Sequence, residues 1–372
     1  MLYLDNSATT QVHPEVKEAM LPYLMDIFGN PSSKYYPQAV SSKSAVSIAR
    51  QEVARLIGSK EDEVIFTSGA TESNNFIIKG ISDQRKHMGK HIITTAVEHP
   101  SVLEVFNYLE RIGYVVTILS VNEEGFISLK EFKEAIRPET ILASIQWGNS
   151  ELGTIQPIEE LSEICKEHGV FLHSDATQVV GKVNIELDSL PGLSSISLSA
   201  HKYFGPKGVG AVFLRKDQYS MYPDITPLLH GGGQENGLRS GTLAVHNIVG
   251  MGKASEIAYN NLENHKLKLN DLESYLKQLL SEKFGTNIKF NNPIKDKIPG
   301  IMNVQFLGIN NEILVKKLSS TIAVSTGSAC SASKPSHVLA AIGMRINDIR
   351  QTIRFCLSPY IDKDELDIFK SL

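Results

Sequence analysis

Short apolar runs alternate with amphipathic stretches from about Glu63 to Leu214, and this alternation limits the folds available to the chain. The order is strand, helix, strand, which is typical of an α/β fold. The amphipathic stretches predict crossover helices between parallel strands, and two of them end on the glycine expected at a helix C-cap. These helices are predicted at residues 101–113, 128–136 and 158–169. The strands are predicted in one large, mostly parallel sheet, at residues 63–68, 91–97, 114–121, 141–147, 170–176, 195–200 and 208–214.

The pattern changes after this sheet. A Gly-rich segment at 228–242 is followed by a long helical stretch at 246–284, which predicts a bridge into a second unit. The polar residues 291–299 are predicted to form a loop. Strands predicted at 301–307, 323–328 and 352–358, with helices between them, indicate a smaller α+β unit. A length of 372 residues also favours two domains, which we place at 13–258 and at 1–12 with 259–372.

Composition excludes several classes of function. The 37 basic and 41 acidic residues give a net charge of -4, so the chain has no basic coat for direct contact with nucleic acid. Three cysteines without a CxxC pair predict neither a disulfide framework nor a cysteine zinc site, and no other spacing predicts a metal. No apolar run approaches the length that spans a bilayer, and the first residues do not resemble a secretion signal. We expect a cytoplasmic protein without a membrane partner.

A lysine at the end of a core strand is the first candidate for chemistry. Lys202 closes the sequence SLSAHK and precedes a Gly-Pro-Lys-Gly turn, which is unusual for a solvated surface charge. The alternative is a lysine that extends from the sheet edge into solvent. The motif HSDATQ places Asp175 at the end of another strand, where open α/β sheets bind ligands, although an aspartate there can also be a helix cap. Together, a Schiff-base lysine and a carboxylate for a pyridine nitrogen are the two groups that pyridoxal phosphate requires.

A phosphate site is predicted where a third strand ends. In TSGATESNN, residues 67–75, a turn leads into a helix near Ala70 and Thr71. Backbone N–H groups at a helix start, with the Thr71 hydroxyl, can bind a phosphate dianion. The alternative is an ordinary helix cap, because Thr71 followed by Asn74 partly matches a capping box.

Nine motifs in order resemble the cysteine desulfurases, which are pyridoxal-phosphate enzymes of the class V aminotransferase group. The resemblance covers nearly the whole chain, and the STGSACS segment is similar to the Isc-type and nitrogenase-type enzymes. The motifs are YLDNSATT (3–10), FGNPSS (28–33), FTSGATESNN (66–75), EHPSV (98–102), HSDATQ (173–178), SAHKYFGPKGVG (199–210), GGGQENGLRSGT (231–242), STGSACS (325–331) and IRFCLS (353–358).

The resemblance implies a fold-type I enzyme, a homodimer with shared active sites, and pyridoxal 5'-phosphate as the cofactor. It implies that Lys202 binds the cofactor covalently, that Asp175 pairs with the pyridine nitrogen and that Gln178 hydrogen-bonds the ring hydroxyl. His99 would stack on the ring and assist proton transfer, while Asn149 and Arg354 would orient the substrate, with Arg354 binding its carboxylate. The implied phosphate ligands are Ala70, Thr71, Ser199 and His201, together with Thr242 from the neighbouring subunit.

Cys330 is the implied nucleophile, and small residues surround it, as expected of a loop that carries sulfur between sites. L-cysteine would become L-alanine, with its sulfur captured as a persulfide on the Cys330 thiolate. Cys165, in an amphipathic helix, and Cys356, in a strand, are predicted to be inert core residues.

Three departures from the family pattern affect the acceptor and the packing around the cofactor. The segment 145–153 contains Trp147 and Gly148 where relatives often have histidine and a small aliphatic residue. The stretch after Cys330 is slightly shorter than in Isc-type relatives, and the tail after residue 362 is short. We therefore expect a sulfur-acceptor protein from iron–sulfur cluster assembly, tRNA thiolation or DNA phosphorothioation, with weaker delivery to an iron–sulfur scaffold.

Two other readings remain open at this point. A selenocysteine lyase or a β-eliminating lyase would use the same cofactor groups, but simple elimination does not need the thiol of Cys330. A catalytically idle scaffold would keep the fold and bind a partner, although the joint presence of Lys202, Asp175, His99 and Cys330 argues against it.

Overall fold

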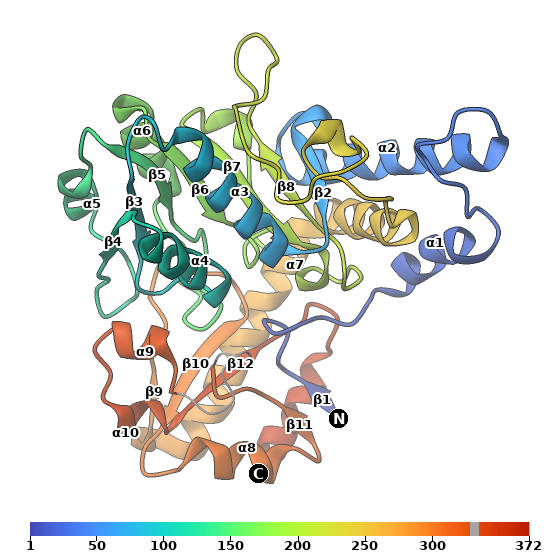
Figure 1. Ribbon diagram of the computed structural model, residues 1–372. Coiled ribbons are helices and arrows are strands. Elements are labelled where there is room, and N and C mark those ends of the chain that lie inside the picture. The colour runs from blue at the N-terminus through green and yellow to red at the C-terminus, as the bar shows by residue number, and fades with distance from the viewer. Residues whose placement is uncertain (328–334, 372) are drawn as a thin grey trace.

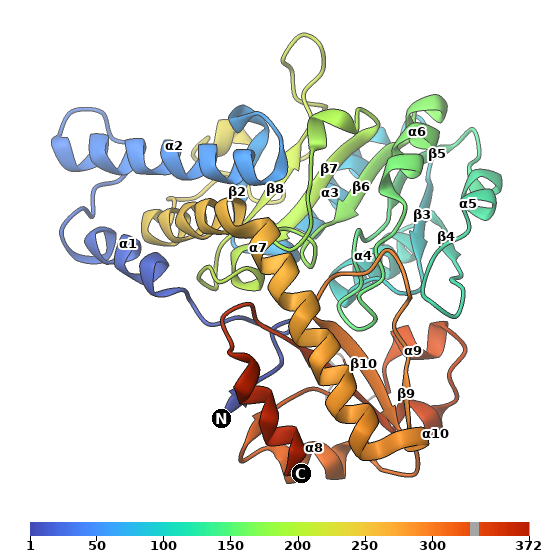
Figure 2. The same ribbon diagram turned by 180° about the vertical axis from the view of Figure 1, so that it is seen from behind.

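The computed structural model describes residues 1–327 and 335–371, and Cys330 lies outside these described residues. In the described part, the chain forms a large sheet covered by helices and a smaller unit below it (Figure 1). A long helix, α7, runs from one to the other, as the rear view shows (Figure 2). Within residues 1–327 and 335–371, no helix combines the length and the apolar character that crossing a bilayer demands.

All seven predicted strands form one sheet, which confirms the predicted core. Its order is β2-β8-β7-β6-β5-β3-β4. The pairs from β4 to β7 are parallel, whereas β8 runs antiparallel to both β7 and β2. The strands are β2 (Val64–Thr67), β3 (His91–Thr95), β4 (Val115–Leu119), β5 (Thr140–Ser144), β6 (Phe171–Asp175), β7 (Leu193–Ser199) and β8 (Gly210–Leu214).

Helices cover both faces of this sheet, because its central strands are buried on both sides. One face packs against α3 (Ala70–Arg85) and α4 (Pro100–Arg111), through side chains such as Phe76 and Phe106. The other face packs against α2 (Pro37–Ile57), α6 (Ile158–His168) and the first half of α7. The α6 helix ends on Gly169 in the left-handed conformation, as predicted, whereas Ile112 caps α4 one residue before its glycine. The α1 helix (Pro14–Met25) packs on α7, and the short α5 (Leu129–Ala135) lies near β4 and α6.

The predicted bridging helix is confirmed as α7 (Val245–Phe284). Its first half packs on α1 and α2, and leucines in its second half, such as Leu272 and Leu276, join the core of the smaller unit. The predicted domain boundary at residue 258 stays a prediction, because α7 continues through it without a break.

The smaller unit contains a three-stranded antiparallel sheet of β9 (Ile288–Phe290), β10 (Ile301–Phe306) and β12 (Thr352–Cys356). Residues 291–299 between β9 and β10 form the predicted loop. Beside the sheet, β1 (Leu2–Tyr3) and β11 (Ile322–Ala323) form a separate parallel pair. Three short helices complete the unit: α8 (Asn311–Leu318), α9 (His337–Ala341) and α10 (Ile346–Ile349).

One local prediction in the smaller unit is wrong. The strand expected at 323–328 is only β11, which ends at Ala323. Ser325 still forms an isolated bridge with Arg354, but the segment bends at Thr326, and Gly327 has a φ of 135°, outside the strand region. The last helix is a 3-10 helix (Lys363–Lys370). The remaining single-turn 3-10 helices are Glu61–Glu63, Leu187–Ser189, Ala200–Lys202, Glu235–Gly237 and Gly285–Asn287.

Candidate active site

The carboxyl ends of the central parallel strands open into a cavity of about 540 Å³. The cavity lies where β6 ends at Asp175 and β7 ends at Ser199, which is where open α/β sheets bind ligands. Most of the predicted site residues line it: Ala70, Thr71, His99, Asp175, Gln178, Ser199, His201 and Lys202.

Lys202 is held by the N-terminal segment, far away in sequence. It ends the 3-10 turn that follows β7, and its Nζ donates to the carbonyl oxygens of Ser7 at 2.6 Å and Ala8 at 2.7 Å. Burial lowers the pKa of Lys202 to about 8, and the positive charges of Lys182 and Arg354 act in the same direction. With this pKa about one amine in ten is neutral at pH 7, far more than for an ordinary lysine, and a nucleophile or base requires the neutral form.

Asp175 is buried and held by two hydrogen bonds. Its Oδ1 accepts from the backbone N–H of Thr177 at 3.0 Å. This is a cap-like contact of the kind considered from the sequence. Its Oδ2 accepts from Nδ2 of Asn74 at 2.9 Å. The same Nδ2 donates to the hydroxyl of Ser101 at 2.8 Å, which links the carboxylate to the start of α4. Asp175 is thus fixed as an acceptor at the floor of the cavity.

His99 is the N-cap of α4, and Pro100 follows it at the first helical position. Its Nδ1 lies 2.8 Å from the Ser101 hydroxyl and accepts from the Ser101 N–H at 3.1 Å. Burial lowers the pKa of His99 below its usual value, and the negative charge of Asp175 opposes this shift. The imidazole is therefore predominantly neutral at pH 7 and is linked to Asp175 through Ser101 and Asn74.

The start of α3 provides a phosphate cradle next to Lys202. Gly69 is the N-cap, with a φ of 150°, and α3 begins at Ala70, next to Thr71 as predicted. The N-cap makes no side-chain hydrogen bond, so the capping box considered from the sequence is not formed. A Cβ on Gly69 would lie 3.6 Å from the Ser199 hydroxyl, so this oxygen borders the helix N-terminus. A Cβ on Gly210 would lie 2.6 Å from Gly69 Cα, so only glycine allows this close approach.

The residues of this cavity fit pyridoxal 5'-phosphate. Lys202 offers an amine for its aldehyde, Asp175 offers a buried carboxylate for its pyridinium, and the start of α3 offers N–H donors to its phosphate. His201 lines the same region, and burial, with the charges of Lys202 and Lys207, lowers its pKa to about 4.

Three predicted residues lie elsewhere or are engaged. Asn149 is not on the cavity wall, because its Oδ1 accepts from the N–H groups of Glu151 and Leu152, each at 2.8 Å, and its Nδ2 donates to Val97 O. Thr242 is exposed, away from the cavity of its own chain.

Arg354 is buried beside the N-terminal segment. It pairs with Asp5 at 2.6 Å and donates to the Ser150 carbonyl at 3.1 Å, and its buried Nε has no partner among the described residues. A substrate carboxylate at this guanidinium would compete with Asp5.

Cys330 lies outside the described residues. On one side of that segment, Gly327 lies close to the Glu151 carboxylate, and on the other side the Ser336 hydroxyl donates a hydrogen bond to the same carboxylate.

Two buried acids on the cavity wall were missed from the sequence. Glu98 accepts from the Thr95 hydroxyl and from the Gln146 N–H, both at 2.8 Å, and burial raises its pKa to about 8. Glu151 accepts from Ser336 at 2.6 Å, and burial raises its pKa. The position of Glu98 next to His99 was the available signal, but a charged residue before a helix cap is usually exposed.

Known proteins match this chain over almost all of its length. A family model for the class V aminotransferases matches residues 2–369. The cysteine desulfurase IscS of Dictyoglomus turgidum is 44% identical over 369 residues, which cover 98% of this chain and 92% of that protein. A solved NifS-like protein superposes with a TM-score of 0.92 at 36% identity, covering 100% of this chain and 97% of the other. The structure of SspA in complex with cysteine gives a TM-score of 0.82 at 37% identity, covering 97% and 100%.

Proposed function

This chain belongs to the class V aminotransferases and is a pyridoxal-phosphate-dependent cysteine desulfurase, and from this premise we propose the roles of its residues. The observation that carries the proposal is the placement of the half-buried amine of Lys202 and the buried carboxylate of Asp175 on one cavity. When bound, the cofactor supplies an electron sink for the negative charge that develops at the substrate Cα.

Lys202 binds the cofactor and then serves as the base for the substrate Cα proton. With its pKa lowered to about 8, the amine takes and returns a proton near neutral pH. The carbonyls of Ser7 and Ala8 fix the direction of Nζ through hydrogen bonds at 2.6 Å and 2.7 Å. His99 assists proton transfer as a predominantly neutral imidazole at the start of α4.

Asp175 holds the protonated ring nitrogen of the cofactor. Its orientation is supported by the Asn74 amide and the Thr177 N–H, which donate to its two oxygens. A fixed carboxylate at this position would keep the ring nitrogen protonated and so support the electron sink that the cofactor supplies. Gln178, on the same wall, orients the ring hydroxyl.

The start of α3 would hold the cofactor phosphate. The N–H groups at Ala70 and Thr71 point out of a helix N-terminus, where the helix dipole favours an anion, and the Thr71 and Ser199 hydroxyls add donors. His201, which lines the same cavity, completes this group.

Arg354 binds the substrate carboxylate, for which its guanidinium must give up part of its pairing with Asp5. Asn149 acts indirectly: it fixes the turn that carries Ser150 and Glu151, rather than touching the substrate with its own amide. The Ser150 carbonyl in turn accepts from Arg354.

Cys330 is the proposed sulfur acceptor. Its thiolate attacks the substrate sulfur, so that an S–S bond forms and the Cβ–S bond of the substrate breaks, with the bonding electrons remaining on the three-carbon fragment. Protonation of that fragment yields alanine, and the sulfur remains as a persulfide on Cys330. An acceptor protein then removes the sulfur by attack of its own thiolate.

The proposal is tested by alanine production from L-cysteine with the cofactor-loaded protein and a reductant, beside the Cys330→Ala variant. We expect alanine from the wild type and almost none from the variant. Equal alanine from both would support a lyase of the selenocysteine type, pyruvate in place of alanine would support a β-eliminating lyase, and a colourless purified protein that makes neither would support the idle scaffold. Cys165→Ala is the matched control, because Cys165 is buried inside α6.

The identity of the acceptor is a prediction from the sequence, and labelled sulfur tests it. Protein loaded with sulfur-labelled cysteine is offered an iron–sulfur scaffold, a tRNA-thiolation enzyme or a DNA-phosphorothioation enzyme. We expect weaker transfer to the scaffold than to one of the other two classes. Dominant transfer to the scaffold would contradict this part of the proposal.

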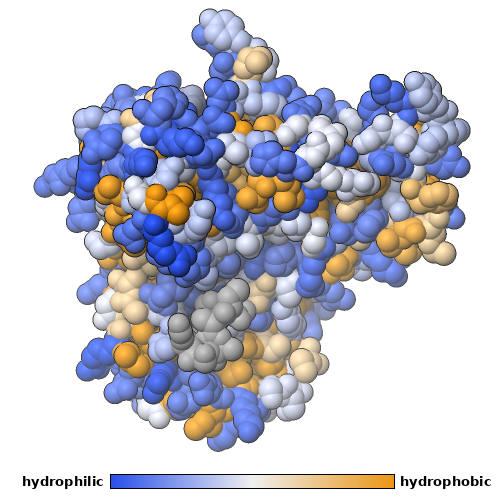
Figure 3. Space-filling model, viewed as in Figure 1, coloured by the Kyte–Doolittle hydropathy of each residue, from blue (hydrophilic) through white to orange (hydrophobic). Residues whose placement is uncertain are grey.

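We also propose a homodimer in which Thr242 reaches the phosphate of the neighbouring subunit. Thr242 is exposed and is not among the residues that line the cavity of its own chain. The arm formed by α1 and α2 carries apolar side chains on its surface, on the right of Figure 3, of which Met25 is 74% exposed and Phe28 is 76% exposed. Apolar side chains gathered on one arm favour burial against a second copy.

A further inference from the structure

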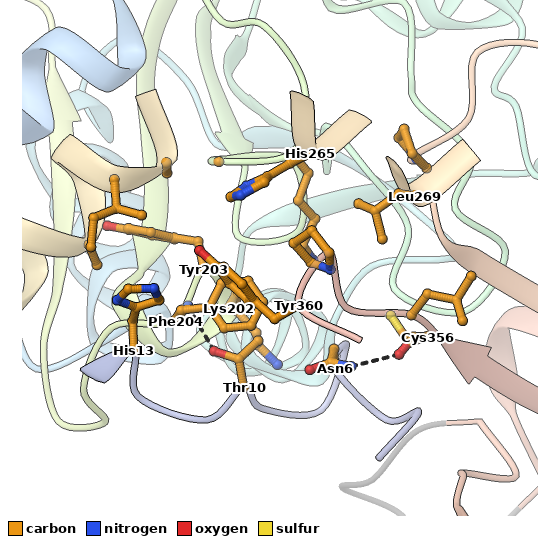
Figure 4. Close-up of a pocket in the computed structure, with 18 of the residues that line it drawn as sticks. Asn6, Thr10, His13, Lys202, Tyr203, Phe204, His265, Leu269, Cys356 and Tyr360 are labelled. Carbon is orange, nitrogen blue, oxygen red and sulfur yellow. Dashed lines mark hydrogen bonds between the residues drawn. The ribbon is translucent and has the colours of Figure 1, made fainter. Parts of the chain in front are cut away.

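A second cavity, of about 30 Å³, shares Lys202 with the large one (Figure 4). Its walls come from the N-terminal segment, from α7 and from the segment after β12, as Asn6, Leu269 and Tyr360 mark in the figure. Lys182 also lines this cavity, and the mechanism above assigns it no role. Burial lowers the pKa of Lys182 below its usual value. Burying an amine in this cavity costs free energy, so its presence there needs a physical explanation.

Two hydrogen bonds connect Lys182 to the carbonyl that holds Lys202. Lys182 Nζ donates to Oε1 of Gln178 at 3.0 Å. Because an ammonium group only donates, this bond fixes which end of the Gln178 amide faces Lys182. The other end, Nε2, donates to the Ser7 carbonyl at 3.0 Å, and the same carbonyl accepts from Lys202 at 2.6 Å. Lys182 therefore sets the direction in which Gln178 presents its donor.

Charges of both signs act on Lys202. Lys182 and Arg354 lower its pKa, whereas Asp175 and Cys356 raise it, and burial remains the largest cause. Arg354 also lowers the pKa of Lys182, whereas Cys356 raises it. The other titratable groups that line the large cavity are Glu72, Glu98, His99, Glu151, His201, Lys207 and His337, and those that line the small one are His13, Tyr203, His265 and Tyr360. Arg354 pairs with the carboxylate of Asp5 at 2.6 Å, whereas Nζ of Lys182 donates to the neutral amide of Gln178.

We propose that Lys182 is a positioning residue for the cofactor lysine: it fixes the Gln178 amide by hydrogen bonding and favours the neutral amine of Lys202 by charge repulsion. This inference rests on the proposed role of Lys202. The neutral form matters because only a lone pair on Nζ can bond to the aldehyde carbon of the cofactor, a condensation that releases one water and needs no oxidant. A protonated Lys202 must first give its proton to solvent.

The test is the pH dependence of cofactor incorporation into the apoenzyme, followed by the visible absorbance of the bound cofactor. For the wild type, the rate rises with pH through a midpoint near the Lys202 pKa of about 8. Lys182→Met removes the charge and keeps the chain length. We expect its midpoint to move up by about one pH unit, which makes incorporation about tenfold slower at pH values below the midpoint.

Two further variants separate the charge from the hydrogen bond. Lys182→Arg keeps a cation and should keep the wild-type midpoint, whereas Lys182→Gln keeps a donor but loses the charge and should shift like Lys182→Met. Lys166→Met, on the exposed face of α6, is the control for loss of a lysine elsewhere. If Lys182→Met does not fold, as judged by circular dichroism, Lys182→Gln provides the neutral variant.

An unchanged midpoint in the folded neutral variants would overturn the charge role, and equal shifts in the arginine and neutral variants would overturn it as well. A failure of the proposed function is distinguishable from either result. Borohydride reduction followed by peptide mass spectrometry shows which lysine bears the cofactor, and attachment to a residue other than Lys202 would refute the assignment of Lys202 itself.

Discussion

At the scale of single residues, burial lowers the pKa of a base and raises the pKa of an acid at this site. It lowers the pKa of Lys202 to about 8 and raises that of Glu98 to about 8, because both groups lose water that stabilises their charged forms. The first shift provides a neutral amine for chemistry. The second leaves a neutral carboxyl group on the cavity wall at pH 7, where it adds no negative charge beside Asp175.

Glu98 makes the stability of the protein depend on pH. The folded state binds the proton of Glu98 more tightly than the unfolded chain, so this contribution is full below about pH 4.5 and is lost as the pH rises through about 8. Glu98→Gln cannot ionise, so its stability lacks this pH dependence. From about pH 5 to about pH 9, the difference in unfolding free energy between the variant and the wild type should therefore change by on the order of 3 kcal/mol in favour of the variant. Chemical unfolding of the two apoproteins at both pH values measures this, and a difference that does not change with pH would contradict it.

Asp175→Asn tests the carboxylate at the cavity floor. The variant keeps the size of the side chain and loses the negative charge that would hold the cofactor ring nitrogen, so kcat for alanine formation should fall by about 10²-fold to 10³-fold. Asp188→Asn, on the surface, is the control. A variant that keeps more than half of the wild-type kcat would remove Asp175 from the mechanism.

At the scale of helices and strands, the close contact between α3 and β8 positions the phosphate cradle. Gly210 begins β8, and a Cβ there would lie 2.5 Å from Leu198 O and 2.6 Å from Gly69 Cα. Both of these neighbours are backbone, so they cannot move aside as a flexible side chain does. The start of α3 would have to shift away from Ser199.

Gly210→Ala should therefore weaken both stability and cofactor binding. We expect a loss of about 1–3 kcal/mol in unfolding free energy, and a cofactor dissociation constant about tenfold higher or more. Denaturant titration and equilibrium dialysis with pyridoxal 5'-phosphate measure the two effects. Gly232→Ala is the control, because its new Cβ meets only the Gln234 side chain, at 3.2 Å. Unchanged cofactor affinity in Gly210→Ala would show that the cradle tolerates the shift.

The elements were predictable where their signal is local. The seven strands of the large sheet and the α7 helix follow from apolar runs and from helical periodicity. The antiparallel direction of β8 was not predictable, because an apolar run does not encode strand direction. The expected strand at 323–328 failed because its apolar residues stop at Val324, and a Ser-Thr-Gly-Ser sequence follows.

At the scale of the whole molecule, the site joins parts of the chain that are far apart in sequence. Ser7 and Ala8 hold Lys202, and Asp5 pairs with Arg354. Motifs located the lysine and the arginine, but no local pattern reveals which distant backbone carbonyl or acid meets them. Asn74 is a similar case, since from the sequence it was read as a cap partner of Thr71, whereas it binds Asp175.

The proposed homodimer is tested by light scattering on the cofactor-loaded protein. We expect a mass twice that of the 41.0 kDa chain. A variant with both Met25→Glu and Phe28→Glu places charges on the apolar arm and should shift the protein toward the monomer, with loss of activity. Ile294→Glu, at a side chain that is 92% exposed in the smaller unit, is the control. A wild-type protein that is active as a monomer would exclude shared active sites.

The central claim is that sulfur leaves cysteine through Cys330. The most direct measurement is a single turnover with L-cysteine in the absence of acceptor and reductant, followed by alanine determination and peptide mass spectrometry. The account predicts one alanine for each sulfur atom added to the peptide that contains Cys330, with no sulfur added to the peptides of Cys165 and Cys356. Alanine formed without sulfur on Cys330 would contradict it.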